Sequence, residues 1–226
     1  MQRVEPRDLT NKLFRIAVRP HRLHEDPRVV LPEAIQPVAF ESVFREKDSF
    51  KVLELGTGWG EFALEWLAAH PEHEYLAMEV KYDRVFTMLK KAGRAGIANL
   101  KVIPINFNWF LESILPRDVF DLIIINFPDP WPKRRHWKHR LVQTGLPERL
   151  APLLRKSGSI FLATDYGPYA RRMLRVFRDS SLFEPIYDFP HYLRRRPDEH
   201  PGTRFEEMTM AQGRTPYYQK WRIAAT

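Results

Sequence analysis

Hydrophobic and polar residues follow no regular pattern over the first 50 positions. A regular pattern begins after that. From Lys51 onward, short apolar runs alternate with segments in which apolar residues recur every three or four positions. The short runs are typical of buried strands, and the longer spacing is typical of helices packed on one face. The pattern therefore predicts strand–helix units in an α/β fold, with a mostly parallel sheet and helices on both of its faces.

The predicted elements follow one another without an internal repeat. Strands are expected at 51–55, 75–80, 100–105, 120–126, 159–163, 183–189 and 217–223, and helices near 38–46 and at 61–70, 82–95, 109–115, 141–156 and 166–179. The helix over 141–156 is expected to end at Ser157-Gly158. No helix is expected between the last two strands, which should form an antiparallel edge of the seven-stranded sheet.

The chain divides into a basic arm, residues 1–50, and one domain, residues 51–226. Five prolines interrupt the arm, and basic residues recur along it, at Arg3, Arg7, Lys12, Arg15, Arg19, Arg22 and Arg28. We expect the arm to be partly ordered. It either covers the sheet or grips a phosphate backbone, and the pattern leaves both functions open.

Composition narrows the class of protein. The 226 residues are 44% hydrophobic and 28% charged, with a net charge of +8 and no cysteine. The absence of thiols excludes disulfides and thiolate chemistry and fits a cytoplasmic protein. No apolar run reaches the roughly 20 residues of a membrane helix, and no secretory signal is visible. The positive charge favours a polyanionic partner.

A glycine-rich turn follows the first regular strand. It reads V-L-E-L-G-T-G-W-G and places Gly56, Gly58 and Gly60 where a backbone can approach a ligand closely. Glu79 ends the second strand, where a carboxylate can accept hydrogen bonds from ribose hydroxyls. The alternatives are structural: the glycines form only a tight turn, Glu54 only caps a helix or braces a loop, and Asn106, just after the third strand, is a plain turn residue.

The residues from Asn126 to Arg140 contain one carboxylate, Asp129, between two prolines. Prolines stiffen this loop at the carboxyl end of a strand, where open α/β sheets place their chemistry. The basic residues that follow are typical of a solvated face, but Trp131 and Trp137 among them favour contact with nucleic acid bases. His136 and His139 have no further ligand group nearby, so no metal site is predicted.

These motifs resemble those of the tRNA (guanine-N7)-methyltransferases. The resemblance lies in F-P-D-P-W-P-K with the basic run after it, in G-x-G-x-G-E-F upstream, and in A-T-D-Y and T-x-F-E downstream. It covers about 51–221. It implies a Rossmann-like methyltransferase that transfers a methyl group from S-adenosyl-L-methionine to N7 of a guanosine in the tRNA variable loop.

The resemblance also implies roles for individual residues. Asp129 would be the catalytic residue, in contact with both the methyl donor and the base. The methyl donor would lie against Glu54, the three glycines, Glu79 and Asn106, whose side chain would reach the adenine. The tRNA would be held by Lys133, Asp165, Thr203, Arg204, Phe205 and Glu206.

Three positions depart from the family pattern: Asn106 stands where Asp is usual, Trp59 where a smaller or basic residue is common, and His139 where Arg is usual. Asn106 can still accept a hydrogen bond from the adenine amine, so we expect a changed affinity rather than a lost site. Two rival functions are a non-catalytic RNA-binding protein on the same scaffold and a protein or small-molecule methyltransferase. The enzyme is expected to be a monomer or homodimer.

Overall fold

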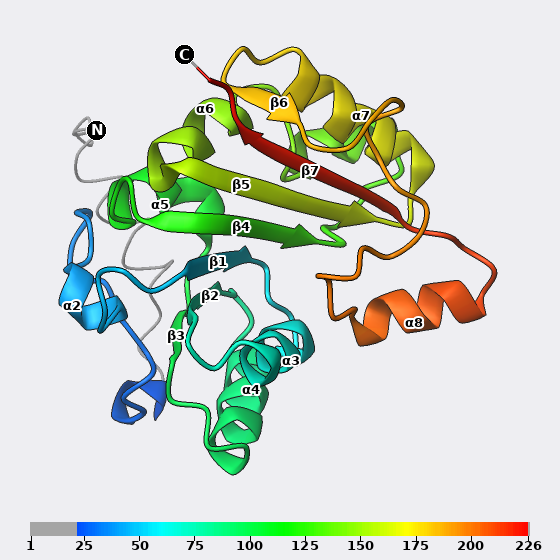
Figure 1. The fold of residues 1–226 in the computed structure, drawn as a ribbon. Helices are drawn as coiled ribbons and strands as arrows, with labels where there is room; N and C mark the ends of the chain where they lie inside the picture. The colour runs from blue at the N-terminus through cyan, green and yellow to red at the C-terminus, as the bar shows by residue number, and fades with distance from the viewer. Residues whose placement is uncertain (1–21, 226) are drawn as a thin grey trace, which may run out of the picture.

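Seven strands form one sheet in the order β3-β2-β1-β4-β5-β7-β6 (Figure 1). In this computed structural model, residues 22–225 are described. The strands are β1 (Lys51–Leu55), β2 (Glu74–Met78), β3 (Leu100–Ile103), β4 (Phe120–Asn126), β5 (Leu154–Thr164), β6 (Phe183–Pro185) and β7 (Tyr217–Ile223). β7 runs antiparallel to β5 and β6, and the other neighbours are parallel. The expected sheet, with its antiparallel edge, is confirmed.

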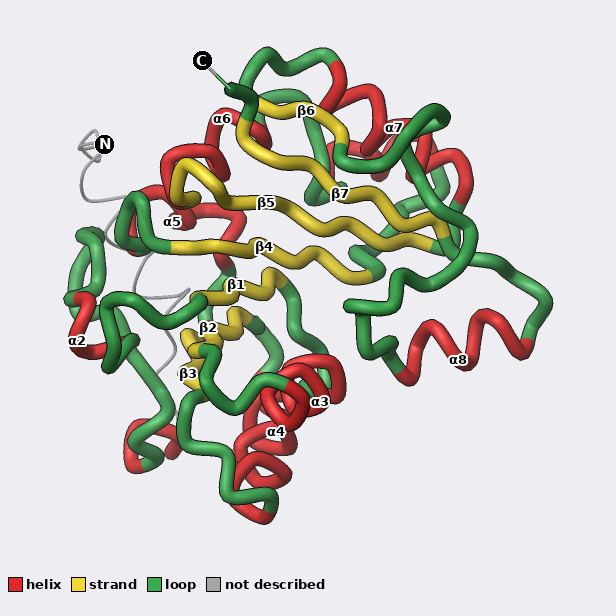
Figure 2. The backbone as a smooth tube through the Cα atoms, in the orientation of Figure 1, coloured by secondary structure: helices red, strands yellow, loops and turns green. Residues whose placement is uncertain are grey.

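Helices cover both faces of the sheet (Figures 1 and 2). α3 (Glu61–Ala69) and α4 (Tyr82–Arg94) pack on one face, while α5 (Phe107–Ile114), α6 (Leu146–Leu150) and α7 (Gly167–Arg178) pack on the other. The remaining helical segments are α2 (Phe40–Val43), α8 (Arg204–Ala211), η1 (Arg22–Glu25), η2 (Arg134–His139) and η3 (Ala151–Leu153).

β4 shows why its sequence is apolar at consecutive positions. Ile123 and Ile125 belong to the core on the α5–α7 face, whereas Leu122 and Ile124 belong to the core on the α3–α4 face. Side chains alternate between the two faces of a strand, so a strand covered on both faces must be apolar throughout. The residue at which this run ends, Asn126, therefore enters the loop from a rigid position.

The prediction of one helix over 141–156 is wrong. The structure has the short helices α6 and η3 there, and β5 begins at Leu154. Ser157-Gly158 does not end a helix, because the β4–β5 register shifts from Phe120 opposite Leu154 to Leu122 opposite Ser159. The extra residues form a bulge within β5, and a bulge often contains the small, turn-forming residues that also end helices.

The expectation of no helix between the last two strands is also wrong, since α8 lies there. Thr203 is its N-cap, and the Thr203 side chain accepts a hydrogen bond from the Glu206 amide at 2.9 Å. The spacing of T-x-x-E is a capping signal, although its apolar residues are too few to show a buried face. The strand expected over 183–189 is limited to β6.

The described part of the arm extends the sheet at its β3 edge. Val29 forms a parallel bridge with Val102, and the Val30 amide donates to the Val102 carbonyl at 2.9 Å. Val38 and Phe40 pack against the core on the α5–α7 face. Residues 22–50 thus cover the sheet in part, while the basic residues from Arg3 to Arg19 lie outside the described residues.

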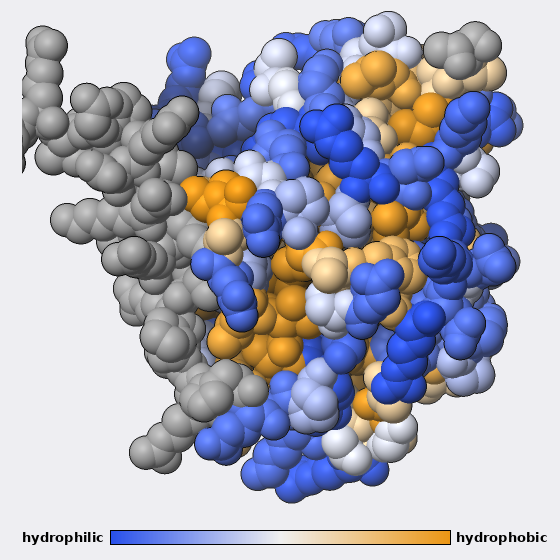
Figure 3. All heavy atoms as spheres, turned by 90° about the vertical axis from the view of Figure 1, so that its left-hand side faces the viewer, coloured by the Kyte–Doolittle hydropathy of each residue, from blue (hydrophilic) through white to orange (hydrophobic). Residues whose placement is uncertain are grey.

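The surface is mainly polar. On the face shown in Figure 3, hydrophilic residues surround apolar ones that gather near its centre. Within residues 22–225, none of the helices is both long and apolar enough to span a bilayer.

Two glycines of the turn after β1 have different structural roles. Gly60 is the N-cap of α3 with φ of 79°, and a Cβ there would lie 2.3 Å from Met88 Cγ. Gly58 also has a positive φ, of 60°, but a Cβ there would meet nothing within 4 Å. Gly60 therefore packs the turn on α4, whereas Gly58 leaves open space above the backbone.

We expect Gly60→Ala to lower the free energy of unfolding by about 2–4 kcal/mol, through backbone strain and overpacking. Gly58→Ala is the matched control and should cost only about 1–2 kcal/mol, because strain alone acts there. Denaturant unfolding of both variants measures the difference. Equal losses would show that Met88 does not restrict this position.

Candidate active site

The site lies where the strand order reverses. β1 and β4 are neighbours at the centre of the sheet, with β2 and β3 continuing on one side and β5 on the other. Open α/β sheets bind ligands at the carboxyl ends of the strands at such a switch point. The amides of Gly56 and Thr57 donate to the Met78 carbonyl at 2.8 and 3.3 Å, which fixes the glycine turn at this end of β1.

A cavity of about 670 Å³ opens at this point, and we call it the central cavity. Its walls come from the turn after β1, the end of β4 and the start of α8. The side chains and backbone that line it include Glu54, Gly56, Thr57, Gly58, Trp59, Asn126, Phe127, Asp129, Thr203, Arg204, Phe205 and Met208. The structure thus brings together seven of the site residues expected from sequence: Glu54, Gly56, Gly58, Asp129, Thr203, Arg204 and Phe205.

Glu54 is a buried carboxylate in the wall of the central cavity. Its Oε2 accepts hydrogen bonds from Thr57 Oγ1 at 2.5 Å and from Tyr75 Oη at 2.9 Å. Burial raises the pKa of Glu54 to about 7, and the two hydroxyl donors and the nearby Asn126 amide oppose that rise. Glu54 therefore changes charge near neutral pH.

Glu79 supports the glycine turn from the end of β2. The amides of Val80 and Lys81 both donate to its Oε1 at 2.9 Å, and the Gly58 amide donates to its Oε2 at 3.0 Å. Arg84 Nη1 also lies 3.6 Å from Oε2. A carboxylate has about four acceptor positions, so at most about one remains for a ribose hydroxyl. Glu79 lies beside the central cavity and is not among the residues that line it.

Asp129 is the free carboxylate of the site. It is exposed, lines the central cavity, and forms no hydrogen bond or ion pair with any residue from 22 to 225. The backbone is left-handed on both sides of it, with φ of 46° at Phe127 and 40° at Trp131. Non-glycine residues adopt this conformation at a cost, and such strain is often found at functional loops.

Arg140 holds this loop in place. It is 6% exposed, and its guanidinium donates to the carbonyls of Pro130 at 2.7 Å and Trp131 at 3.3 Å. It also lies over the rings of Trp137 and Tyr169, at 4.7 and 4.9 Å from their centroids. Arg140 is therefore a structural residue of the loop, although the positive charge of the chain favours a polyanionic partner.

The other cations of the run are exposed. Lys133, Arg134, Arg135 and Lys138 all face solvent, the last three within η2. Trp137 is 41% exposed, and the Arg134 guanidinium lies 5.7 Å from its ring centroid. This surface carries several positive charges next to Asp129.

Asn106 lies apart from the central cavity. It is the N-cap of α5 and lines a second cavity of about 470 Å³, with Trp109, Lys138 and Arg149 among its neighbours. We call this the lateral cavity. Phe107, the next residue, would lie 4.0 Å from a Cβ at Gly56, so α5 begins beside the glycine turn.

Two further residues expected from sequence are engaged elsewhere. Glu206 is fully buried, where Arg196 Nε donates to its Oε1 at 2.6 Å and Tyr218 Oη donates to the same oxygen. Asp165 accepts a hydrogen bond from Arg214 at 2.6 Å. Both carboxylates hold the segments around α8, and neither lines the central cavity.

The sequence reasoning missed several residues of the central cavity. The pattern predicts Asn126 only as the end of a strand, and it gives no sign of His200, whose Nε2 lies 3.1 Å from the Asn126 side-chain oxygen. It shows Trp59 only as a departure from the family pattern; the side chain is 44% exposed, and the Arg84 guanidinium lies 5.8 Å from its ring centroid. The long sequence separation of Asn126 and His200 left no local signal for that pair.

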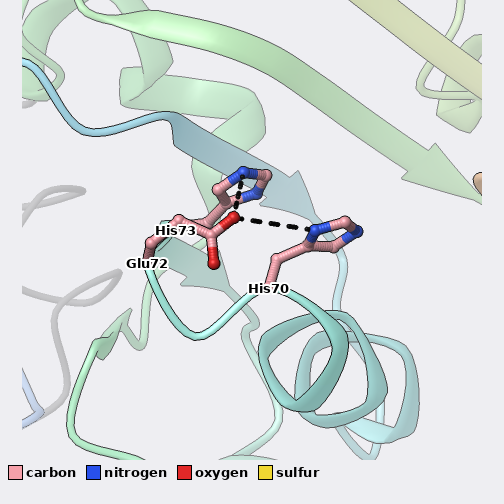
Figure 4. A group of neighbouring side chains, drawn as sticks. All are labelled: His70, Glu72 and His73. Atoms are coloured by element: carbon pink, nitrogen blue, oxygen red, sulfur yellow. Dashed lines mark ion pairs between the residues drawn. The ribbon is translucent and has the colours of Figure 1, made fainter.

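One cluster of histidines and a carboxylate lies far from this site. His70, Glu72 and His73 lie between α3 and β2, at the opposite end of the sheet (Figure 4). The two imidazoles stack at 4.6 Å with planes 7° apart, so their in-plane lone pairs do not converge. His73 Nδ1 also accepts a hydrogen bond from Trp66 at 3.2 Å, which places the proton of the neutral ring on Nε2, facing Glu72. The cluster is hydrogen-bonded rather than arranged for a metal.

Comparison with known proteins agrees with this geometry. The family described as "Putative methyltransferase" matches residues 48–218. A tRNA (guanine-N(7)-)-methyltransferase from Leptospira interrogans is 39% identical over 184 residues, covering 81% of this chain and 83% of the relative. One from Nitrosomonas eutropha is 35% identical over 190 residues, covering 84% and 83%.

Solved structures show the same fold at low sequence identity. An rRNA methylase from Streptococcus thermophilus gives a TM-score of 0.52 at 11% identity over 100% of both chains. A ribosomal protein L11 methylase from Lactobacillus delbrueckii subsp. bulgaricus gives 0.52 at 16% identity, over 79% of this chain and 72% of that one. Both the Rossmann-like fold and the methyltransferase class expected from sequence are confirmed, and this chain belongs to the tRNA (guanine-N7)-methyltransferase family.

Proposed function

We propose that this enzyme methylates N7 of a guanosine in the tRNA variable loop, with Asp129 at the centre of the reaction. The observation that supports this most is that the Asp129 carboxylate has no partner among the described residues. Of the carboxylates that line the central cavity, Glu54 and Glu61 are hydrogen-bonded, and Asp129 forms no bond with the described residues. A free carboxylate beside exposed cations suits a substrate that offers both hydrogen-bond donors and phosphates.

The central cavity fits the methyl donor. Open space above Gly58 lets a ligand approach the backbone, and the buried Glu54 and free Asp129 suit a group with positive charge. When bound, S-adenosyl-L-methionine supplies an electrophilic methyl group. Glu54, Gly56 and Gly58 would hold it, with Glu79 behind the turn. Asn106 lines the lateral cavity instead, so any contact with the donor would come from outside the central cavity.

Guanine N7 carries a lone pair and no proton, so no residue needs to act as a base. The protein's main task is to position the base, which alone can contribute about 7–11 kcal/mol. A base stacked in an RNA loop must turn outward to enter the cavity. The edge that carries N1–H and N2–H₂ matches a carboxylate, because both donors lie in one plane.

Asp129 would act in two ways. Its oxygens accept hydrogen bonds from the base, and its negative charge stabilises the positive charge that guanine gains as N7 is methylated. α8 would form the opposite wall through Thr203, Arg204 and Phe205, and the Phe205 ring lies 5.2 Å from that of Phe127. In this proposal, Glu206 and Asp165 support that wall from behind.

The overall proposal is tested by incubating the enzyme with labelled S-adenosyl-L-methionine and unmodified tRNA, and then mapping the labelled nucleotide. Label at guanine N7 in the variable loop is expected. Label at another nucleotide would correct the target. RNA binding without any transfer would support the non-catalytic alternative.

Asp129→Ala should reduce methylation by about 10²-fold or more while the melting temperature stays within about 2 °C of wild type. The matched control is Asp198→Ala, which removes another exposed carboxylate with only a 3.8 Å contact to Arg195. Single-turnover methylation measures the loss in both variants. Comparable turnover in Asp129→Ala and wild type would contradict the assigned role.

Lys133→Ala should weaken tRNA binding and reduce the slope of log K against log salt by about 0.7–0.9, the range for one phosphate contact with single-stranded to double-stranded nucleic acid. Lys156→Ala is the control, because Lys156 is exposed in the bulge near the start of β5, away from the carboxyl ends of the strands. Binding titrations from low to physiological salt give both slopes. Equal slopes for wild type and Lys133→Ala would argue against a phosphate contact of Lys133.

A further inference from the structure

His200 lies beneath the central cavity, in the segment that leads from β6 to α8. It is 4% exposed, and its ring lies between Phe62 of α3 and Phe161 of β5, with centroid distances of 4.6 and 4.7 Å. Tyr218 of β7 closes a third side at 5.7 Å. The ring is therefore held in one orientation by elements from three parts of the fold.

The imidazole is neutral. Burial, together with the weaker effect of the Arg196 charge, lowers the pKa of His200 to about 3. Glu206 Oε2 lies 3.9 Å from Nδ1 and would favour the charged form, but the bond from Arg196 Nε to the other oxygen of Glu206 neutralises that carboxylate. A neutral imidazole carries one N–H and one acceptor nitrogen.

The neighbours of the ring determine which nitrogen carries the proton. The Gly202 amide, which can only donate, lies 3.2 Å from Nδ1, so Nδ1 is the acceptor and Nε2 carries the hydrogen. Nε2 lies 3.1 Å from the side-chain oxygen of Asn126. Since an N–H needs an acceptor, this contact fixes the orientation of the Asn126 amide.

The other end of that amide faces the donor side of the cavity. Asn126 Nδ2 is buried and makes no hydrogen bond to the described residues, yet it lies close enough to Glu54 to lower the pKa of that carboxyl. The remaining groups that face Glu54 are the hydroxyls of Thr57 and Tyr75 and the carboxylate of Glu79. Asn126 is thus a neutral amide on the β4 side of Glu54 that favours the ionised form of that carboxyl.

We propose that His200 is a positioning residue of the methyl-donor site, which keeps the Asn126 amide turned so that its N–H₂ group faces Glu54. Without His200, the amide can rotate and present its oxygen to the carboxylate, which disfavours the ionised form. This inference rests on the proposed function, because it assigns Glu54 to the site of the cationic methyl donor. It adds two residues to that site: Asn126 at the end of β4 and His200 in the segment before α8.

The sign of the pH effect follows from linkage. A cationic ligand favours ionised Glu54, so binding releases a proton wherever Glu54 is protonated in the free protein. Affinity should rise with pH through the pKa of about 7 and become constant above it. A variant with a higher pKa for Glu54 binds more weakly at pH 7 and equally well at pH 9.

The test compares His200→Leu with His200→Gln, whose amide can still donate to Asn126. Binding of S-adenosyl-L-methionine is titrated calorimetrically from pH 6 to 9 with the full chain. For an upward shift of one unit in the Glu54 pKa, His200→Leu should bind about fivefold more weakly at pH 7 and regain wild-type affinity at pH 9. His200→Gln should stay close to wild type.

Asn126→Leu provides the same test if His200→Leu fails to fold, because it removes the amide and keeps the imidazole. An unchanged midpoint in the variant that folds, or a loss of affinity that is equal from pH 6 to 9, would overturn the proposal and leave a purely structural role. If the wild-type protein binds no S-adenosyl-L-methionine, the proposed function itself fails, and this inference fails with it.

Discussion

The parallel pairing of β1 with β4 is the constraint on which the site depends. Leu53 lies opposite Ile123 and Glu54 opposite Ile124, so the ends of the two strands reach the same edge of the sheet. Both strands are buried on both faces, and a shift of one residue would turn each apolar side chain to the wrong core. This register places Glu54 and Asn126 in the wall of the same cavity.

The two halves of the site differ in whether their charged side chains already have hydrogen-bond partners within the protein. On the donor side, Glu54 and Glu79 are buried, and between them they accept hydrogen bonds from two hydroxyls and three backbone amides. On the acceptor side, Asp129 and Lys133 are exposed and unpaired among the described residues. This arrangement fits a small ligand that needs a preformed pocket and an RNA that brings its own charges and donors.

Local patterns were sufficient for the strands and for the loop. The apolar runs predicted every strand of the sheet, and the glycines and the prolines around Asp129 marked both sides of the cavity. Patterns failed where distant residues decide the outcome: Asn126 and His200 are 74 positions apart, and Asp165 and Arg214 are 49 apart. The prediction at the bulge in β5 was wrong for a related reason. Ser-Gly is common both in bulges and at helix ends, so Ser157-Gly158 alone does not distinguish the two.

In the loop around Asp129, the basic residues that follow one another in the sequence have different roles in the structure. Left-handed backbone at Phe127 and Trp131 costs about 1–2 kcal/mol at each residue, and a flexible loop would relax it. Pro128 and Pro130 restrict the backbone between them, and the buried Arg140 binds the carbonyls of Pro130 and Trp131. One cation therefore maintains the bend that turns the carboxylate toward the cavity. Because Arg140 is used in this way, the cations of the run that can meet a ligand from solvent are the exposed ones before it.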